Sequence, residues 1–193
     1  MDVNPTDWFY DELAEVYAAG VVNGGNDGSF RPYQEVTRAQ FAAFLVRAFA
    51  AQALKDPGVA RQVFSDVPPS FWGFVEVAAA VEAGLVRGVG DGTRFAPNAP
   101  ITRAQMAAMI CRALLPAGAT AGGERSLSAG EVRVFTDVPL NYWAAGEIAE
   151  AYEVGVVSGG NDGRFRPEET TKRAHAVTVI ARAMSIQEGS AGD

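Results

Sequence analysis

The sequence predicts a mainly α-helical protein built from three helix–loop–helix repeats that pack on one another. Three observations support this. The same pattern of rare residues recurs three times along 193 residues, each copy contains two segments with helical spacing of apolar residues, and a glycine-rich loop separates those segments. A two-helix unit cannot bury its apolar stripe alone, so the three units are expected to share one core.

Each repeat carries its marker residues in a fixed order. An Asp-Val pair precedes a Trp, a Gly follows twelve residues after the Trp, and an Arg lies eight residues after the loop Phe. The Trp-to-Trp spacings are 64 and 71 residues. The recurring residues are Asp2, Asp66 and Asp137; Trp8, Trp72 and Trp143; Gly20, Gly84 and Gly155; and Arg38, Arg103 and Arg173.

The first helix of each unit is predicted from the first copy, between Trp8 and Ala19. Leu13, Val16 and Tyr17 form an apolar stripe at helical spacing. Gly20 is placed to end this helix, because glycine tolerates the left-handed backbone conformation past the last turn.

The loop and the second helix follow. Residues Asn23 to Gly28 have the composition of a turn, and Pro32 keeps the next stretch extended. The run Thr37-Arg38-Ala39-Gln40 reads as a capping box that starts the second helix, and residues 102–105 repeat it.

The units are not identical. The third has Lys172 and His175 at the two capping positions, so we expect Thr171 to cap its second helix one residue early. Unit two carries one extra loop residue before Phe95, and unit one lacks the apolar residue that precedes the Asp in Phe64-Ser65-Asp66 and Phe135-Thr136-Asp137. The expected organisation is module one at 1–50, a linker at 51–63, module two at 64–114, a flexible linker at 115–134, module three at 135–186 and a tail at 187–193, together forming one domain.

Composition excludes several classes of function. With 23 acidic and 16 basic residues the net charge is -7, which argues against a general nucleic-acid binder and against a polybasic membrane-surface protein. One Cys and one His allow neither an internal disulfide nor a Cys/His metal cage. No segment is apolar and long enough to insert in a membrane. We therefore expect no cofactor, no metal and no catalytic residue.

The motifs resemble S-layer homology (SLH) modules. The loop stands as Gly24-Gly25-Asn26-Asp27-Gly28-Ser29-Phe30-Arg31-Pro32, and the second helix begins with the capping run at Thr37. The resemblance implies a pseudo-threefold spindle of helices with grooves between neighbouring modules. In that family the grooves bind anionic, often pyruvylated, secondary cell-wall polysaccharide without covalent attachment. It also implies an extracellular location in a bacterial cell wall or S-layer.

The resemblance assigns glycan binding to residues that recur in every unit. The motif arginines would contact the acidic sugar, and the Asp and Trp markers follow more loosely: Arg38, Arg103 and Arg173, with Asp2, Asp66 and Asp137 and Trp8, Trp72 and Trp143. Arg offers a rigid fork for a carboxylate, the positive start of a helix favours anions, and an exposed Trp face suits a sugar ring. Because the third unit departs most, we expect the grooves of Arg38 and Arg103 to be the functional ones.

Each of these residues also has a purely structural interpretation. The arginines could face solvent or pair with acids, the Trp residues could anchor packing, and the Asp residues could cap or form salt bridges within the fold. The loop carboxylate of Asp27 and its counterparts Asp91 and Asp162 is expected to hold a turn, since calcium needs six to eight oxygens. Structural pairs are expected from the recurring Glu12, Glu76 and Glu147 and from Arg47, Arg112 and Arg182, and Cys111 is expected to be a small buried residue.

Two other functions compete with cell-surface anchoring. A glycoside hydrolase needs a pair of carboxylates that normally occurs once, whereas every recurring carboxylate here occurs three times. A helical-repeat module for protein partners, or for S-layer assembly without direct glycan binding, is the alternative. Other S-layer subunits would then be reached through further parts of the parent protein. Because a wall anchor must be exported and no export signal precedes Asp2, we expect the chain to be a fragment of a larger secreted protein or a version shortened for expression.

Overall fold

The computed structural model describes residues 2–55, 62–114 and 134–190. Within these ranges the chain forms seven helices and no sheet, which confirms the mainly α-helical prediction. The helices are α1 (Tyr10–Ala18), α2 (Arg38–Phe49), α3 (Ala51–Lys55), α4 (Phe74–Glu82), α5 (Arg103–Leu114), α6 (Ala145–Glu153) and α7 (Arg173–Ser190).

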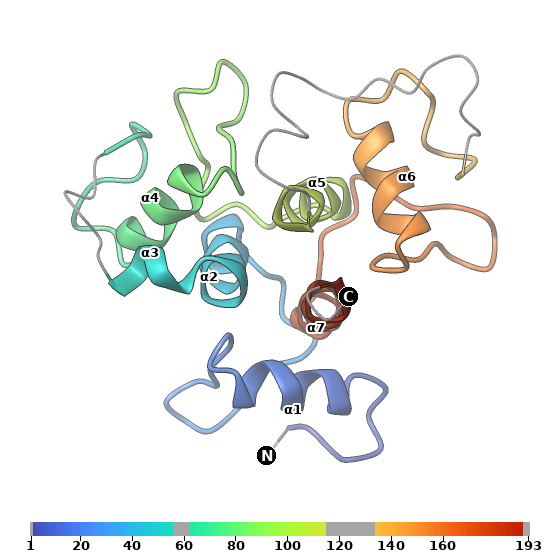
Figure 1. Cartoon of the computed structure of the whole chain (residues 1–193), viewed down its shortest axis with the longest axis horizontal. Coiled ribbons are helices and arrows are strands. Elements are labelled where there is room, and N and C mark those ends of the chain that lie inside the picture. The colour runs from blue at the N-terminus through green and yellow to red at the C-terminus, as the bar shows by residue number, and fades with distance from the viewer. Residues whose placement is uncertain (1, 56–61, 115–133, 191–193) are drawn as a thin grey trace.

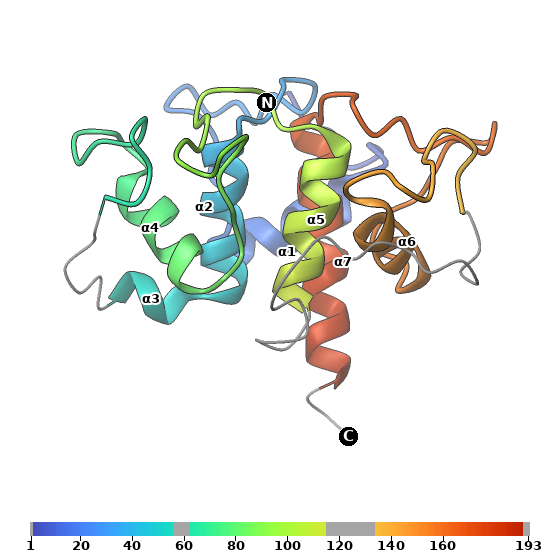
Figure 2. The ribbon, with the colours of Figure 1, turned by 90° about the horizontal axis from the view of Figure 1, so that it is seen from above.

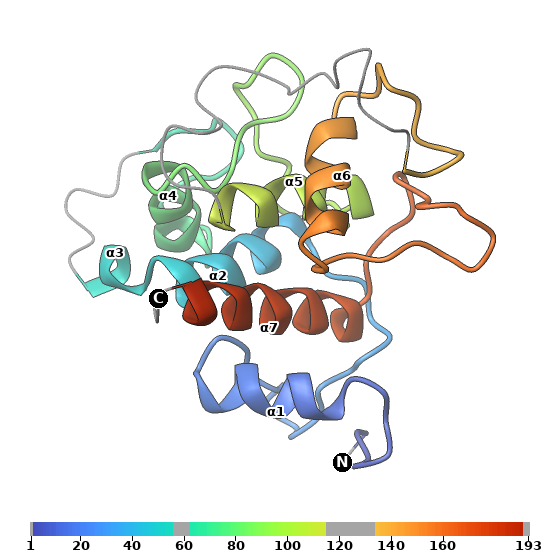
Figure 3. The same ribbon diagram turned by 45° about the vertical axis from the view of Figure 1, so that its right-hand side comes forward.

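The helices are arranged with threefold pseudosymmetry. The second helices of the three units, α2, α5 and α7, pack together at the centre, and α1, α4 and α6 lie outside them (Figure 1). Seen from above, the three inner helices run side by side (Figure 2). Each outer helix packs on the inner helix of another unit: α1 on α7, α4 on α2 and α6 on α5, and Figure 3 shows α1 beneath α7. The units therefore exchange their first helices to build one core.

The core lies where these helices meet. Phe41 and Leu45 of α2, Ile110 of α5 and Ile180 of α7 are fully buried at the centre. Phe9, just before α1, is buried as well. Burying one such side chain contributes about 1.5–3 kcal/mol, so the shared core provides most of the stability that no single unit could reach.

A closed ring of backbone hydrogen bonds joins the units just ahead of the inner helices. The Val36 N–H donates to the Thr171 carbonyl (3.0 Å), the Thr171 N–H to Ile101 (2.9 Å), and the Ile101 N–H to Val36 (2.8 Å). The three residues occupy equivalent positions in the repeat. The ring therefore fixes the register of the three units against each other.

The inner helices begin as predicted in two units out of three. The Thr37 hydroxyl accepts from the Gln40 N–H while the Gln40 side chain accepts from the Thr37 N–H, and Thr102 and Gln105 repeat both bonds. In unit three the expectation is wrong, because the buried Thr171 hydroxyl has no hydrogen-bond partner in the described part of the chain. The start of α7 keeps the backbone bonds to the neighbouring unit that all three inner helices have: the N–H groups of Arg173 and Ala174 donate to Gln34 and Pro32 of unit one.

Helix ends agree with the sequence at the glycines and differ elsewhere. Gly20, Gly84 and Gly155 follow the outer helices with φ of 71°, 73° and 78°, as expected for a left-handed terminator. The first helix begins at Tyr10, two residues after Trp8. Helix α3 occupies the start of the expected 51–63 linker, and α7 continues through residues 187–190 of the expected tail. The expected 115–134 linker lies, apart from its last residue, outside the described residues.

Candidate functional site

One groove lies at the junction of all three units beside Arg38, with a volume of about 360 Å³. We call it the Arg38 groove. Unit one contributes Arg38 at the start of α2, and unit three contributes Trp143 and Glu168. Unit two contributes its loop and one face of α5, and its lining residues are Arg87, Gly88, Val89, Gly90, Thr102, Gln105, Ala108, Met109 and Arg112.

A second groove of about 300 Å³ repeats this arrangement one unit further on. We call it the Arg103 groove. Arg103 of unit two faces Ser158, His175 and Arg182 of unit three, and Trp8 of unit one completes the wall. His175 takes the place that Gln105 has in the first groove. Its ring centroid lies 5.0 Å from that of Trp8.

Arg38 is bound to the neighbouring unit through backbone carbonyls. Its Nε donates to the Phe95 carbonyl (2.7 Å) and its Nη2 to the Arg87 carbonyl (3.2 Å). The guanidinium carbon lies 4.7 Å from the centre of the Phe95 ring, a cation–π geometry. Arg38 therefore neither faces solvent nor pairs with an acid, and both simple structural alternatives for it are wrong.

The other two motif arginines make the same contacts. Arg103 donates to the carbonyls of Phe165 (2.7 Å) and Ser158 (2.9 Å), and Arg173 to those of Phe30 (2.8 Å) and Asn23 (3.1 Å). Each guanidinium also covers the ring of the Phe whose carbonyl it binds. The repeated arginine thus joins each unit to the next, with its guanidinium orientation fixed before any ligand arrives.

Arg38 is only 5% exposed, and no carboxylate of the described residues lies within ion-pair distance of it. Burial, and then the nearby Arg112 charge, lowers the pKa of Arg38 to about 10. The side chain therefore stays charged at neutral pH. A buried cation without a carboxylate partner is costly unless an anion compensates it, which favours anion binding in this groove.

The backbone N–H groups at the starts of the inner helices do not bind an anion as the sequence suggested. The N–H groups of Arg38 and Ala39 donate to the carbonyls of Ala99 and Pro97, and α5 and α7 have equivalent bonds. Since these first-turn donors are already used by the neighbouring unit, an anion in the groove must be recognised by side chains.

The tryptophans are partly exposed, and each ring also contacts a neighbouring aromatic ring. Trp8, Trp72 and Trp143 have exposed fractions of 54%, 56% and 37%, whereas the following residues, such as Phe9 and Ala144, are buried. The deeper packing is therefore provided by the following residues, and the Trp rings contribute at the surface. Trp8 and Trp143 line the two grooves, and Trp72 lies in neither lining.

The aspartates of the Asp-Val pairs hold the loops of their own units. Both carboxylate oxygens of Asp2 accept backbone bonds, from the N–H of Phe30 (2.8 Å) and of Arg31 (2.6 Å), and these bonds lower the pKa of Asp2. Arg31 has a φ of 59°, so the carboxylate stabilises a strained backbone position. The counterparts Asp66 and Asp137 do the same. The capping interpretation is confirmed, and glycan contact by these residues stays a prediction.

Among the other recurring polar residues, some have the role expected from the sequence and others do not. Asp27 accepts from the N–H and hydroxyl of Ser29, as expected for a turn. Arg47 pairs with Glu76 at 3.0 Å, joining α2 to α4 as a structural pair. In the described ranges Arg112 and Arg182 form no direct ion pair, although the charge of the recurring Glu147 acts on Arg112. Cys111 is buried, and desolvation raises the pKa of its thiol.

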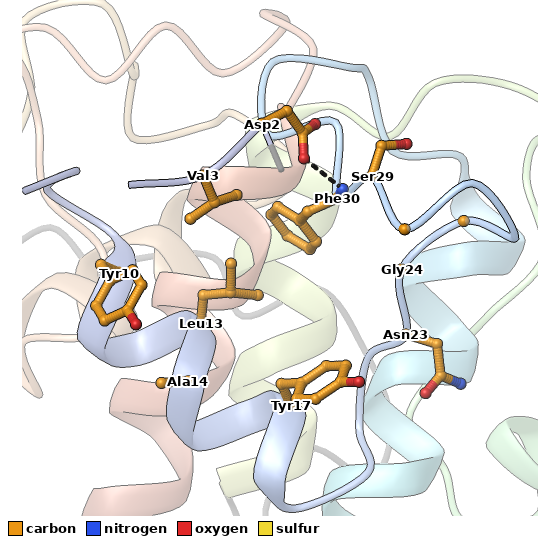
Figure 4. Close-up of a pocket in the computed structure, with 12 residues that line it drawn as sticks. Asp2, Val3, Tyr10, Leu13, Ala14, Tyr17, Asn23, Gly24, Ser29 and Phe30 are labelled. Carbon is orange, nitrogen blue, oxygen red and sulfur yellow. Dashed lines mark hydrogen bonds between the residues drawn. The ribbon is translucent and has the colours of Figure 1, made fainter. Parts of the chain in front are cut away.

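A further cavity of about 520 Å³ lies inside unit one (Figure 4). Val3, Leu13, Tyr17 and Phe30 surround it, and the dashed bond from the Phe30 N–H to Asp2 crosses its rim. In units two and three the corresponding space holds an aromatic ring.

Phe64 lies against Phe95 with centroids 5.3 Å apart, and Phe135 lies against Phe165 (5.2 Å) and Tyr152 (5.1 Å). Phe30 and Tyr17, which line the pocket of unit one, are the counterparts of Phe165 and Tyr152, which contact Phe135 in unit three.

Comparison with known proteins agrees with the repeat pattern. The family model of the S-layer homology domain matches residues 2–42, 63–107 and 134–177. An endoglucanase of Bacillus sp. (strain KSM-635) is 32% identical over 93% of the chain, the S-layer protein sap of Bacillus anthracis 28% over 94%, and a cellulosome-anchoring protein of Acetivibrio thermocellus 28% over 86%.

The chain is short beside these relatives. It spans 18% of the endoglucanase, 20% of the S-layer protein and 36% of the cellulosome-anchoring protein. Among the described residues, no helix combines the length and the hydropathy that a membrane crossing requires.

Proposed function

Because the chain belongs to the S-layer homology domain family, we propose that it attaches its parent protein to a bacterial cell surface by binding an anionic wall polysaccharide. Binding is non-covalent and takes place in the grooves between modules. The family assignment supports attachment at the cell surface. So do relatives named as an S-layer protein and a cellulosome-anchoring protein. In this proposal the ligand is secondary cell-wall polymer with ketal pyruvate groups.

One observation carries the proposal: the grooves combine a fixed, charged arginine with an exposed indole. In the Arg38 groove the guanidinium is held by two carbonyls and uses neither its Nη1 nor a carboxylate partner in the described structure. A pyruvate ketal presents a planar carboxylate to such a fork, while its sugar ring can lie on Trp143. The Arg103 groove offers Trp8 in the same way.

The chain itself is proposed to be non-catalytic. The relatives with enzyme names are several times longer than the matched segment, so their catalytic regions have ample room outside it. The recurring aspartates, which an enzyme reading would recruit, have both oxygens bound to backbone N–H groups.

The test is binding of the purified chain to isolated wall polysaccharide, with and without its ketal pyruvate. We expect saturable binding that Arg38→Ala with Arg103→Ala abolishes and that pyruvate removal weakens at least tenfold. Arg94→Ala is the matched control, because Arg94 is exposed and lines neither groove.

Since the motif arginines also join the units, a second pair of variants keeps the test decisive. Trp8→Ala with Trp143→Ala removes side chains that are 54% and 37% exposed and is expected to weaken binding while lowering the unfolding midpoint less than the double arginine variant does. Undiminished binding by both double variants would reject the groove assignment. Failure to bind any wall polymer, together with retention on S-layer protein, would favour the protein-partner alternative.

A further inference from the structure

We propose that His175 contacts the bound carboxylate in the Arg103 groove and makes anion binding there tighter as the pH falls below neutrality, whereas binding in the Arg38 groove does not change over the same range. The inference deepens the proposed function and rests on it for the identity of the ligand as an acidic glycan. A sugar with a single carboxylate satisfies it, as it satisfies the proposed function.

His175 lies in the lining of the Arg103 groove, on the first turn of α7. Its side chain is exposed, and the centre of its ring lies 5.0 Å from that of Trp8, which comes from unit one. Arg103 of unit two enters the same groove from the start of α5. An anion in this groove therefore lies beside a guanidinium, an imidazole and an indole, each from a different unit.

The Arg38 groove has Gln105 at the equivalent position. The Gln105 side chain accepts a hydrogen bond from the Thr102 N–H, so it belongs to the capping box of α5, and an amide does not titrate. In unit three the capping pair is replaced by Lys172 and His175. A neutral capping residue has thus been exchanged for a side chain that titrates close to neutral pH, at a position that lines a groove.

The charges around His175 oppose its protonation when no ligand is bound. Partial burial, and then the charge of Arg103, lower the pKa of His175 below its usual 6.5, while Glu169 acts in the opposite direction. The other charged side chains nearby on the surrounding elements are Arg182 of the lining, further along α7, and Asp11 and Glu12 in the first turn of α1. A carboxylate bound to Arg103 cancels part of the positive field at the imidazole, so His175 takes up a proton and attracts the same carboxylate.

The size of the effect follows from the contact that a shared ligand requires. A carboxylate that touches both Arg103 and His175 lies within about 4–6 Å of the imidazole, and an opposite charge at that range moves a pKa by about 1–3 units. Solvent screens the exposed His175 ring, and Glu169 already offsets part of the Arg103 charge, so we expect a shift at the lower end. A rise of about one unit tightens binding by up to about tenfold in acid.

The test uses the fact that His175 is the one histidine in the sequence, so NMR detects its Hε1 resonance without overlap. The probe is a methyl glucoside that carries a pyruvate ketal, and the methyl ester of that ketal is the uncharged control. We expect the saturating ketal to raise the midpoint of the His175 titration by about one unit and the ester to leave it unchanged.

The affinity for the same ketal is measured at each groove from the Nε–H resonances of Arg103 and Arg38, which their carbonyl bonds should keep sharp. By linkage, the ketal should bind about fivefold more tightly at about pH 5 than at about pH 7.5 at Arg103, and change less than about twofold at Arg38. The ketal carboxylate stays ionised throughout, since carboxyl groups titrate near pH 4 or below.

The matched variant is His175→Gln, which places in the Arg103 groove the residue that the Arg38 groove already has. It should remove the pH dependence of ketal binding at Arg103. The inference is overturned if the saturating ketal leaves the His175 midpoint unmoved, or if the pH dependence at Arg103 persists in His175→Gln. The first measurement needs no variant, so it decides the matter even if His175→Gln does not fold.

The outcome is separable from that of the proposed function. If the ketal raises the His175 midpoint but isolated wall polysaccharide does not bind the chain, the proton-linked carboxylate site stands and the anchoring proposal fails. If the polysaccharide binds equally at both pH values and leaves the His175 midpoint in place, anchoring stands and the role of His175 fails. If neither ligand binds, both proposals fail.

Discussion

Replacing Arg38 by methionine should destabilise the fold as well as impair binding, because Arg38 holds unit one to unit two. Methionine keeps much of the apolar stem but removes the donors to the Phe95 and Arg87 carbonyls and the cation over the Phe95 ring. Hydrogen bonds from a charged group contribute about 1.5–3 kcal/mol each. The cation–π contact adds about 0.5–2 kcal/mol.

These losses are partly offset, because methionine also removes a charge that is 5% exposed and has no carboxylate partner. The net loss expected is about 2–4 kcal/mol, since the Phe95 and Arg87 carbonyls lose their donor. For a chain of this length that corresponds to a fall in melting temperature of roughly 5–12 °C.

Urea unfolding followed by circular dichroism at 222 nm measures this change, with Arg94→Met as the control. Arg94 has a side chain 67% exposed and should move the unfolding free energy by no more than about 0.5 kcal/mol. If Arg38→Met unfolds within about 0.5 kcal/mol of the unaltered chain, the two carbonyl bonds do not hold the units together. The burial of Arg38 would then have to be explained by ligand binding alone.

Three further predictions concern other parts of the chain. Adding a Phe two positions before Asp2 should fill the cavity of unit one and raise the unfolding free energy by about 1.5–3 kcal/mol, and an added Gly, the control, should not. Burial and the charge of Arg103 lower the pKa of His175 below its usual 6.5, so the folded chain resists protonation of His175. The free energy of unfolding should therefore fall as the pH drops below 6.5. Urea unfolding at pH 7 and pH 5 measures this, and the His175→Gln chain should lack this part of the pH dependence. Deleting residues 134–193 should remove α7 from α1 and expose unit one to rapid amide hydrogen exchange, whereas protection of α1 in the shortened chain would contradict the exchange of helices between units.

Much of the local structure could be read from the sequence. The capping boxes at Thr37 and Thr102, and the helix-ending Gly20, depend on residues a few positions apart, and the structure shows each of them. The cap at Thr171 was wrong because its position is governed by distant chain: the Thr171 backbone lies in the central ring, bonded to Val36 and Ile101.

The sequence predicted which residues belong to the candidate site, but not which contacts they make. The repeat identified Arg38, Arg103 and Trp8 as recurring positions, but no local pattern indicates that an arginine binds carbonyls of the next unit. Likewise, Arg47, Arg112 and Arg182 recur at one position, and only the fold shows that Arg47 meets Glu76 while the other two line grooves. Ion pairing depends on which unit is adjacent, and adjacency is a property of the assembled chain.

The sequence by itself determined the number of units, the helical content and the marker residues, because repeats, apolar periodicity and turn chemistry act over short distances along the chain. The tertiary structure alone decided how the helices are exchanged, with α1 on α7, α4 on α2 and α6 on α5. It also decided that the motif arginines join the units and that Arg38 and Arg103 each line a groove between them. The physical reason is that a short amphipathic helix has no strong preference among equivalent apolar surfaces. The choice among them follows from closing the backbone ring and burying all three inner helices at once.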